Sequence, residues 1–306
     1  MVLTVLLMVA GVGFAALGGE LFVRGVVNIA AWSRVPKGII GATVAAFATS
    51  GPELSVGINA AVAGEPEIAL GDALGSNVVN IAVVLGVALL FAELRVSRGT
   101  RIRELPMAIT APVALGLLAL DGTLSRTDAL LLLAIFAGWI VQTTLAARRA
   151  RDATAAVLLE QSKTAIVASF VGGLVALIVA GRLIVASASD IGAALGWDGF
   201  IVGAVIVAIG TSTPEVATML AARLRRHDEV GVGTVLGSNI FNTLLIVGVA
   251  SLISPIDTDA AAVRIGIIAS TMVVVLAIPG RGGRLARWRS IPLIGSYLAV
   301  LALLSA

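Results

Sequence analysis

The chain contains the segment GATVAAFATSGPEL at residues 41–54 and a second version of it, GAVIVAIGTSTPEV, at residues 203–216. Both segments are apolar apart from one short polar motif, Thr-Ser-x-Pro-Glu. Apolar helices match one another by chance at Ala, Val and Leu, but not at Thr, Ser, Pro and Glu in one register. The recurrence therefore predicts an internal duplication with an offset of 162 residues.

The duplication extends beyond this motif. GDALGSNVVN at residues 71–80 corresponds to GTVLGSNIFN at residues 233–242, again 162 residues later. Between residues 41–91 and 203–253, 19 of 51 aligned positions are identical without a gap. The two halves of the chain are therefore expected to share a fold.

The composition predicts a membrane protein. Of the 306 residues, 58% are hydrophobic and 13% are charged, and the mean hydropathy is +1.06. About a quarter of the residues of a soluble domain are charged, so the composition excludes a cytosolic enzyme, a disordered protein and a nucleic-acid binder. The chain has no cysteine and one histidine, His227, which excludes thiolate and His-rich metal sites.

Apolar runs separated by charges, Gly or Pro predict an all-α polytopic membrane protein with ten transmembrane helices. The expected spans are 3–32, 38–62, 67–92, 102–120, 127–147, 164–195, 199–223, 229–253, 261–279 and 290–305. The first and sixth are long enough to require tilt.

Basic residues divide unevenly between the two predicted sides. With ten spans, 17 of the 21 Lys and Arg residues fall in loops on one side, while Arg126 and Arg264 fall on the other. This is the positive-inside pattern of an inner-membrane, multi-pass protein, and it predicts that both termini lie outside.

Duplication and topology together predict inverted repeats. Each half has five spans, an odd number, so the second half enters the membrane from the opposite side. The predicted halves are residues 1–147 and 164–306, with the duplicated regions at about 38–92 and 199–253. The basic cytoplasmic linker at 148–163 is too short for a soluble regulatory domain. Inverted repeats are typical of transporters, with the substrate site where the copies meet.

Glu53 and Glu215 are the carboxylates that recur deep within predicted helices. An intramembrane carboxylate is costly and points to a functional site. The alternative is a structural ion pair with Arg24 or Arg182. Neither Arg recurs in the other copy, however, and Arg24 has a local candidate partner in Glu20, four residues earlier.

Hydroxyls and a helix breaker surround each Glu. These residues are Thr49, Ser50 and Pro52 in the first copy and Thr211, Ser212 and Pro214 in the second. A proline inside a helix kinks it and frees backbone carbonyls, which a membrane tolerates where they line a cavity. A simple structural kink is the alternative, and the Glu that follows in both copies argues against it.

The Gly-Ser-Asn segments add two further polar pairs, Ser76 with Asn80 and Ser238 with Asn242. A spacing of four places each pair on one helix face. We expect the glycines of these segments to permit close helix approach; they are Gly71, Gly75, Gly233 and Gly237.

The resulting donor set consists of carboxylate, hydroxyl, amide and backbone oxygens. Such hard ligands suit Ca²⁺ and Na⁺ and not copper or zinc. Two carboxylates neutralise one divalent cation. Sodium ions or protons could replace it, because an emptied site would leave two charges in a low dielectric.

These motifs resemble the two α-repeats of the cation/Ca²⁺ exchanger superfamily, and most closely its sodium/calcium exchangers. The resemblance implies a central group of kinked helices, flanked by long tilted first and sixth helices. It implies a secondary antiporter, not an enzyme, that exchanges Ca²⁺ for Na⁺ by alternating access. Its partners would be the lipid bilayer and inorganic cations, with no cofactor, nucleic acid or obligate protein partner.

The resemblance also implies an ion site, with Glu53 and Glu215 as the Ca²⁺ ligands and hydroxyls and carbonyls forming flanking Na⁺ sites. Carried over by position, the site comprises the carbonyl of Ala46, Thr49, Ser50, Glu53, Ser76, Asn80, the carbonyl of Ala208, Thr211, Ser212, Glu215, Ser238 and Asn242.

Three departures bear on the coupling ion. Asn80 and Asn242 are both amides, whereas many sodium/calcium exchangers have Asp at one of these positions. Asp72 and Thr234 stand where Asn is usual, and Ala48 replaces a usual Gly. Asp72 could direct a charge toward the site, line its access path or be a helix-end carboxylate at the outer mouth.

Several alternatives remain open on sequence alone. The same fold could couple to H⁺ or K⁺ or carry another divalent cation, and a passive cation channel is a more distant alternative. An intramembrane enzyme is disfavoured because Ser without a base is not a nucleophile. Asp190, within the sixth span, either faces a water-filled crevice or caps the helix end.

Overall fold

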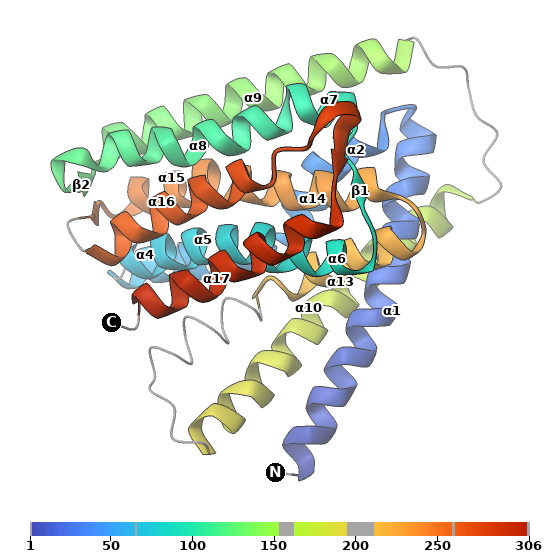
Figure 1. Cartoon of the computed structure of the whole chain (residues 1–306), viewed down its shortest axis with the longest axis horizontal. Coiled ribbons are helices and arrows are strands. Elements are labelled where there is room, and N and C mark those ends of the chain that lie inside the picture. Colours follow the sequence, from blue (N-terminus) through green and yellow to red (C-terminus); the bar gives the residue numbers. More distant parts are fainter. Residues whose placement is uncertain (1, 65, 153–161, 195–210, 259–260, 305–306) are drawn as a thin grey trace.

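The computed structural model describes residues 2–64, 66–152, 162–194, 211–258 and 261–304, and these form a helical assembly (Figure 1). The helices of the first half are α1 (Val2–Ser33), α2 (Lys37–Ile40), η1 (Gly41–Ala45), α3 (Ala46–Thr49), α4 (Gly51–Ala63), α5 (Pro66–Val78), η2 (Val79–Leu85), α6 (Gly86–Phe91), α7 (Arg98–Ile102), α8 (Glu104–Leu118), η3 (Ala119–Asp121) and α9 (Arg126–Asp152). Those of the second half are α10 (Lys163–Ala194), α13 (Thr213–Leu224), α14 (Asp228–Ile240), η5 (Phe241–Ile246), α15 (Val247–Ile253), α16 (Ala261–Leu276), η6 (Arg281–Gly283), η7 (Arg287–Arg289) and α17 (Ser290–Leu304).

The described helices begin and end close to the predicted spans. The largest difference is α9, which continues to Asp152 and so includes Arg148, Arg149 and Arg151, which we assigned to the linker. Among the described residues, five continuous helical stretches are long and apolar enough to cross a membrane, and a bent pair of helices makes a sixth. The helical membrane fold is therefore shown, while the full ten-span layout stays a prediction.

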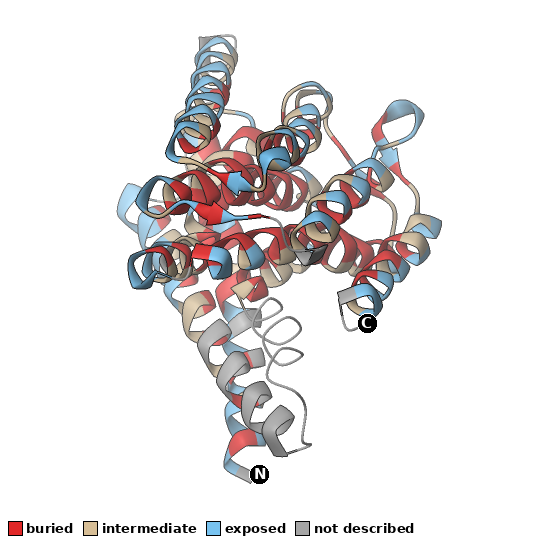
Figure 2. Ribbon diagram, turned by 90° about the vertical axis from the view of Figure 1, so that its left-hand side faces the viewer, coloured by how far each residue is buried: buried red, intermediate tan, exposed pale blue. Residues whose placement is uncertain are grey.

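The duplicated regions supply the centre of the molecule. In the apolar 18-residue segments of Pro66–Phe91 and of its repeat counterpart Asp228–Ile253, 72% and 78% are buried, whereas in the corresponding segments of α9 and α10 only 22% are buried. Figure 2 shows the buried residues concentrated in the middle of the assembly. The segments that carry the polar motifs are thus shielded by other helices.

Small residues allow α14 to contact the chain around η1 closely. A Cβ added at Gly237 would lie 2.3 Å from the carbonyl oxygen of Ala42, and one at Gly233 would lie 2.7 Å from that of Gly38. The expected role of these two glycines is confirmed. The expectation was wrong for Gly71, because a side chain there would have no neighbour within 4 Å.

The long helices α1 and α10 pack along each other at a steep angle to the other helices (Figure 1). Their contact is also made at glycines. A Cβ at Gly173 would lie 2.4 Å from the backbone nitrogen of Phe22, and one at Gly25 would lie 2.6 Å from the Cα of Phe170. This pair matches the two long tilted helices that the resemblance implied.

An ion cluster joins α1 to α13. Arg24 and Glu20 form the expected pair one helical turn apart, at 3.1 Å. Arg225, just beyond the end of α13, also binds Glu20, with its Nε donating at 2.6 Å. Arg24 is therefore paired locally and is not the partner of a buried carboxylate.

Two short strand pairs qualify the all-α prediction. β1 (Leu94–Arg95) pairs with β4 (Arg284–Leu285), and β2 (Thr123–Leu124) pairs with β3 (Ile256–Asp257), both antiparallel. The two pairs lie at opposite ends of the assembly (Figure 1). Each joins a loop of the first half to a loop of the second half that the charge pattern assigns to the same side.

Candidate cation site

Matching backbone turns at the start of two helices position the two carboxylates. The chain leaves helical geometry at Ser50 (φ −81°, ψ 10°) and at Ser212 (φ −80°, ψ 4°), and a new helix starts directly afterwards. The first break bends the helix by 48°, as predicted for Pro52. Residues 195–210, which precede the second motif, lie outside the described residues, so only the start of α13 is compared.

The prolines act differently from a kink inside a continuous helix. Pro52 and Pro214 stand in the first turn of α4 and α13, where a helix has no backbone hydrogen bond for proline to remove. Glu53 and Glu215 therefore also lie in first turns. Unpaired N–H groups and the helix dipole favour negative charge at this position. The motif thus provides partial compensation for a carboxylate buried in the membrane.

The predicted ligands are almost all buried. Glu53 and Glu215 are both 0% exposed, in helices from opposite halves of the chain. Thr211 is the exception and is half-buried. The other fully shielded side chains of the predicted site are Thr49, Ser50, Ser76, Asn80, Ser212, Ser238 and Asn242.

The two carboxylates have different hydrogen-bond partners. The Ser238 hydroxyl donates to Glu215 Oε1 at 3.0 Å, and the Thr49 hydroxyl interacts with the same carboxylate. Neither oxygen of Glu53 has a partner within the described part of the chain. Glu53 instead lies within electrostatic reach of Glu215 and Asp72. The carboxylates are therefore close enough to repel each other.

Buried oxygens without partners mark a place that needs a ligand, since burying an unpaired polar group costs free energy. Most of the buried side-chain polar atoms that have no hydrogen-bond partner among the described residues belong to the predicted ion site or to residues next to it. Those in the predicted set are Ser50 Oγ, both Glu53 oxygens, Asn80 Oδ1, Ser212 Oγ, Glu215 Oε2 and both side-chain polar atoms of Asn242. A cation would satisfy the oxygens in this set.

Wide helical turns carry both asparagines of the site. Asn80 lies in η2 and Asn242 in η5, and these are π-helical segments at matching positions of the two copies. Turns of this kind are rare and are common at functional sites. Their recurrence at equivalent positions adds a shared backbone feature to the shared sequence.

Two further asparagines, Asn77 and Asn239, connect the halves and were missed in the sequence. Asn239 donates to the backbone carbonyl of Asn77 at 3.1 Å and accepts from the amide of Asn80 at 3.1 Å. Asn77 donates to the Thr243 hydroxyl at 2.7 Å. Both recur at the 162-residue offset, and that recurrence is the signal that could have identified them.

Ser76 and Thr211 bring the halves together at a second point, with their hydroxyl oxygens 3.5 Å apart. The Ala46 carbonyl is already engaged, accepting from the Ser50 backbone N–H at 2.9 Å and from the Thr49 hydroxyl at 3.3 Å. Its counterpart Ala208 and the side chain of Asp190 lie outside the described residues.

Glu104 is another fully buried acid that the sequence did not single out. It forms a 3.4 Å ion pair with the adjacent Arg103, although its Oε2 has no partner among the described residues. It has no acidic counterpart 162 residues later, where Gly266 stands. Glu104 is therefore a paired charge separate from the duplicated site.

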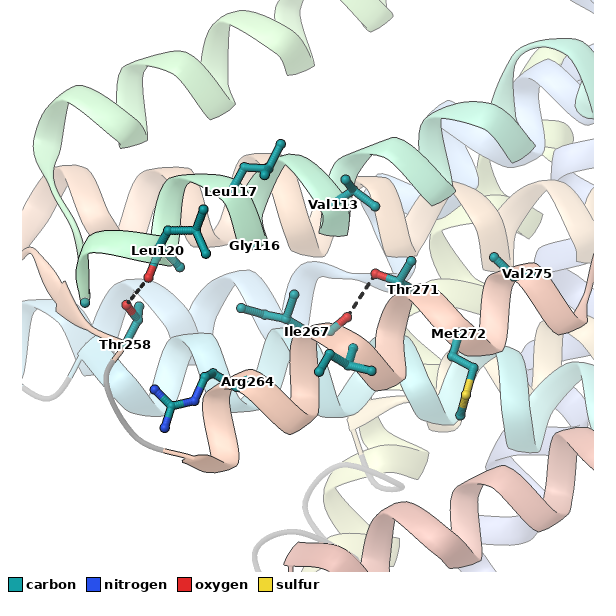
Figure 3. Close-up of a pocket in the computed structure, with 13 residues that line it drawn as sticks. Val113, Gly116, Leu117, Leu120, Thr258, Arg264, Ile267, Thr271, Met272 and Val275 are labelled. Atoms are coloured by element: carbon teal, nitrogen blue, oxygen red, sulfur yellow. Dashed lines mark hydrogen bonds between the residues drawn. The ribbon is translucent and has the colours of Figure 1, made fainter.

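A cavity of about 700 Å³ lies between α8 and α16, away from these ligands (Figure 3). Its lining is mainly apolar, and Arg264 and Thr258 lie toward one end. None of the predicted ion ligands lines it. The candidate cation site is thus the buried polar cluster between the halves and not this hollow.

Known proteins share both the sequence and the fold. The chain matches the family described as sodium/calcium exchanger protein over residues 3–145 and 165–306. It is 34% identical to the inner membrane protein YrbG of Escherichia coli over 237 residues, which cover 74% of this chain and 73% of YrbG. It is 32% identical to the putative antiporter CaxA of Alkalimonas amylolytica over 269 residues, which cover 86% and 84% of the two chains.

A solved structure of the sodium-calcium exchanger NCX_Mj has a TM-score of 0.82 to this structure, at 28% identity, with 98% of each chain covered. The similarity therefore extends over both halves and includes the helices that carry the buried carboxylates. The chain belongs to the sodium/calcium exchanger family.

Proposed function

We propose that the protein is a secondary antiporter that exchanges Ca²⁺ for Na⁺ by alternating access, with Glu53 and Glu215 at the centre of its ion site. The observation that carries this proposal is the convergence of two duplicated, fully buried carboxylates from opposite halves. Their coordination set consists of oxygens alone, the ligands that Ca²⁺ and Na⁺ prefer.

Burial of both carboxylates provides a physical reason for exchange. The two charges can be neutralised by one Ca²⁺ or by monovalent cations. An empty site would leave two charges in a low dielectric without countercharge. A conformational change with an empty site is thus disfavoured, so the outward movement of one ion species is coupled to the inward movement of another.

We also propose a ten-span arrangement of two inverted halves, with boundaries at residues 147 and 164 from the repeat and both termini outside from the charge pattern. The central helices of the two copies are buried, while α1 and α10 pack beside them at a steep angle. We infer that this outer pair moves relative to the centre during alternating access. The exposed face of that pair would allow the movement without disturbing the buried core.

The first test is Na⁺-gradient-driven ⁴⁵Ca²⁺ uptake into vesicles that contain the purified protein. Glu53→Gln or Glu215→Gln should reduce uptake to background, because each removes half of the charge that binds Ca²⁺. Glu67→Gln and Glu229→Gln are matched controls, since this pair also recurs at 162 residues but is exposed. Uptake that persists in both site variants would refute the site assignment.

The coupling ion is tested by replacing the Na⁺ gradient with a K⁺ gradient or a pH gradient. The two amides Asn80 and Asn242 are the reason to include these ions, since they leave the central site without a third carboxylate. Flux that follows only the pH gradient would refute Na⁺ coupling, and single-channel currents would indicate a channel.

A further inference from the structure

The carboxylate of Glu20 links α1 to α13, the helix that carries Glu215. Arg225, directly after α13, donates from its Nε to Glu20 Oε2 at 2.6 Å, and its Nη2 contacts Oε1. Two parallel contacts between a guanidinium and a carboxylate are stronger and more directional than a single one. The pair therefore fixes the position of one helix against another that is distant in the sequence.

Close backbone packing brings the same two helices together beside the pair. A Cβ added at Gly19 would lie 2.8 Å from the carbonyl oxygen of Ala217, so the backbone of α1 lies directly on α13. Ala217 is two residues after Glu215, and Gly19 precedes Glu20. A shift of α1 along α13 would therefore change the distance between Glu20 and Arg225.

The pair crosses the interface that the proposed alternating access would alter. The partner of α1 in that movement is α10, and the two helices are joined by a ring contact between Phe22 and Phe170, with centroids 5.0 Å apart. The Glu20–Arg225 pair connects α1 to the central helices instead. A cycle in which α1 moves relative to α13 must break this pair and form it again.

The surroundings of the pair suit repeated opening. The side chains of Glu20 and Arg225 are 39% and 35% exposed. Water can therefore replace their contact when the helices separate, at a much lower cost than for a buried pair. Glu20 also keeps a local partner, since Arg24 donates to it at 3.1 Å from within α1.

The repeat provides no equivalent pair. The positions that correspond to Glu20 and Arg225 in the other copy are Arg182 and Ala63. These residues do not carry opposite charges, so the same contact cannot form when the inverted halves exchange conformations. The contact is therefore expected in one of the two states only.

We propose that Glu20 is a positioning residue of the exchange: its ion pair with Arg225 holds α1 against the Glu215 helix and favours the state of this structure over the opposite one. Because the opposite state lacks an equivalent pair, the contact shifts the balance between the two states. This assignment rests on the proposed alternating access and adds a residue outside the ion site that controls it.

The test is the distance between spin labels on α1 and α9, measured by double electron–electron resonance in lipid vesicles. Leu6→Cys on α1 and Leu130→Cys on α9 give exposed labelling sites, α9 packs against the central helices α15 and η5, and the chain has no native cysteine. Glu20→Gln and Arg225→Gln should each raise the population of a second distance by roughly threefold to fivefold, the size expected for a partly exposed ion pair.

Arg223→Gln is the matched control. Its partner is Asp228 at 2.9 Å, in α14 and not in α1, so its loss should leave the distances unchanged. The charge-reversed double variant Glu20→Arg/Arg225→Glu keeps the attraction and should return the distances toward those of the wild type.

Unchanged distances in both Gln variants would overturn the proposal. A double variant that shows the sum of the two single effects would also overturn it, because the contact itself would then not be responsible. The distances do not depend on which ion is carried, so they decide on this pair even if the ⁴⁵Ca²⁺ uptake test refutes Na⁺/Ca²⁺ exchange.

Discussion

The two copies of the Thr-Ser-x-Pro-Glu motif have nearly the same backbone but unequal polar surroundings. Ser50 and Ser212 differ by only a few degrees in φ and ψ. Glu215 accepts a hydrogen bond from Ser238, whereas both oxygens of Glu53 are unpartnered among the described residues. Duplication has therefore preserved local geometry while the packing of the two halves has made their carboxylates different.

This difference suggests how the inverted halves exchange roles. The repeat counterpart of the Ser238–Glu215 contact is Ser76 with Glu53, yet here Ser76 lies next to Thr211. Inverted repeats exchange conformations during alternating access. We therefore expect the Ser76 hydroxyl to donate to Glu53 in the opposite-facing state. Glu215 would then have more hydrogen-bond partners in one state and Glu53 in the other.

The largest difference between the halves is expected at the interface asparagines. Asn239→Ala should lower the free energy of unfolding by roughly 3 kcal/mol and Asn77→Ala by roughly 1 kcal/mol, because the first leaves two buried partners unpaired. The measurement is unfolding of each purified variant in detergent. Ser251→Ala is a control, since its buried hydroxyl bonds only within its own helix. Equal losses at the two asparagines would contradict the asymmetry.

An intermediate effect is expected at the carboxylates when no transported ion is present. With choline as the only added cation, Glu53→Gln should stabilise the protein by roughly 2 kcal/mol, because it removes a buried charge that lacks partners. Glu215→Gln should stabilise it by less than about 1 kcal/mol, because the charge lost there is already hydrogen-bonded.

The same unfolding measurement serves for this pair. Glu67→Gln and Glu229→Gln, both exposed, should leave the stability unchanged. A larger gain for Glu215→Gln than for Glu53→Gln would show that the better satisfied carboxylate is on the other half, as in the opposite-facing state.

The smallest effect is expected at the turns that follow the two Glu-bearing helices. Gly64 and its counterpart Arg226 both have positive φ, 84° and 60°. A non-glycine residue is strained in this region. Arg226→Gly should therefore stabilise the protein by roughly 1 kcal/mol, and Gly64→Ala should destabilise it by a similar amount.

Stability of these turn variants is again measured by unfolding. Arg226→Ala separates strain from charge, because it removes the guanidinium and keeps a Cβ, so it should give no gain. A gain as large as that of Arg226→Gly would attribute the effect to the charge and not to the backbone.

The sequence predicted the family, the positions of most helices and the bend at Pro52. It could do so because long apolar runs and proline act locally. It also predicted that Glu53 and Glu215 belong to one duplicated set. The structure adds that both occupy helix N-termini, which the motif alone did not distinguish from a kink within one helix.

The contacts across the halves could not be predicted from helical spacing. The α-helical period predicts that Ser76 and Asn80 share one face, but Asn80 lies in η2, and η2 and η5 have wider turns that alter the register from residues 79 and 241 onward. Asn77 and Asn239 were overlooked because their partners belong to the other copy. Glu104 was overlooked because it lies in a charged stretch of the sequence. Such a stretch does not indicate locally that the packing of α8 buries this residue.

The strand pairs β1–β4 and β2–β3 have a consequence for how the chain is held together. Each pair ties one half to the other, and the two lie at opposite ends of the assembly. They add to the other contacts between the halves, which include the asparagine contacts at the centre and the packing of α1 against α10. The peptide connection between the halves is then one link among several, and two separately synthesised halves would carry within themselves the contacts needed to associate.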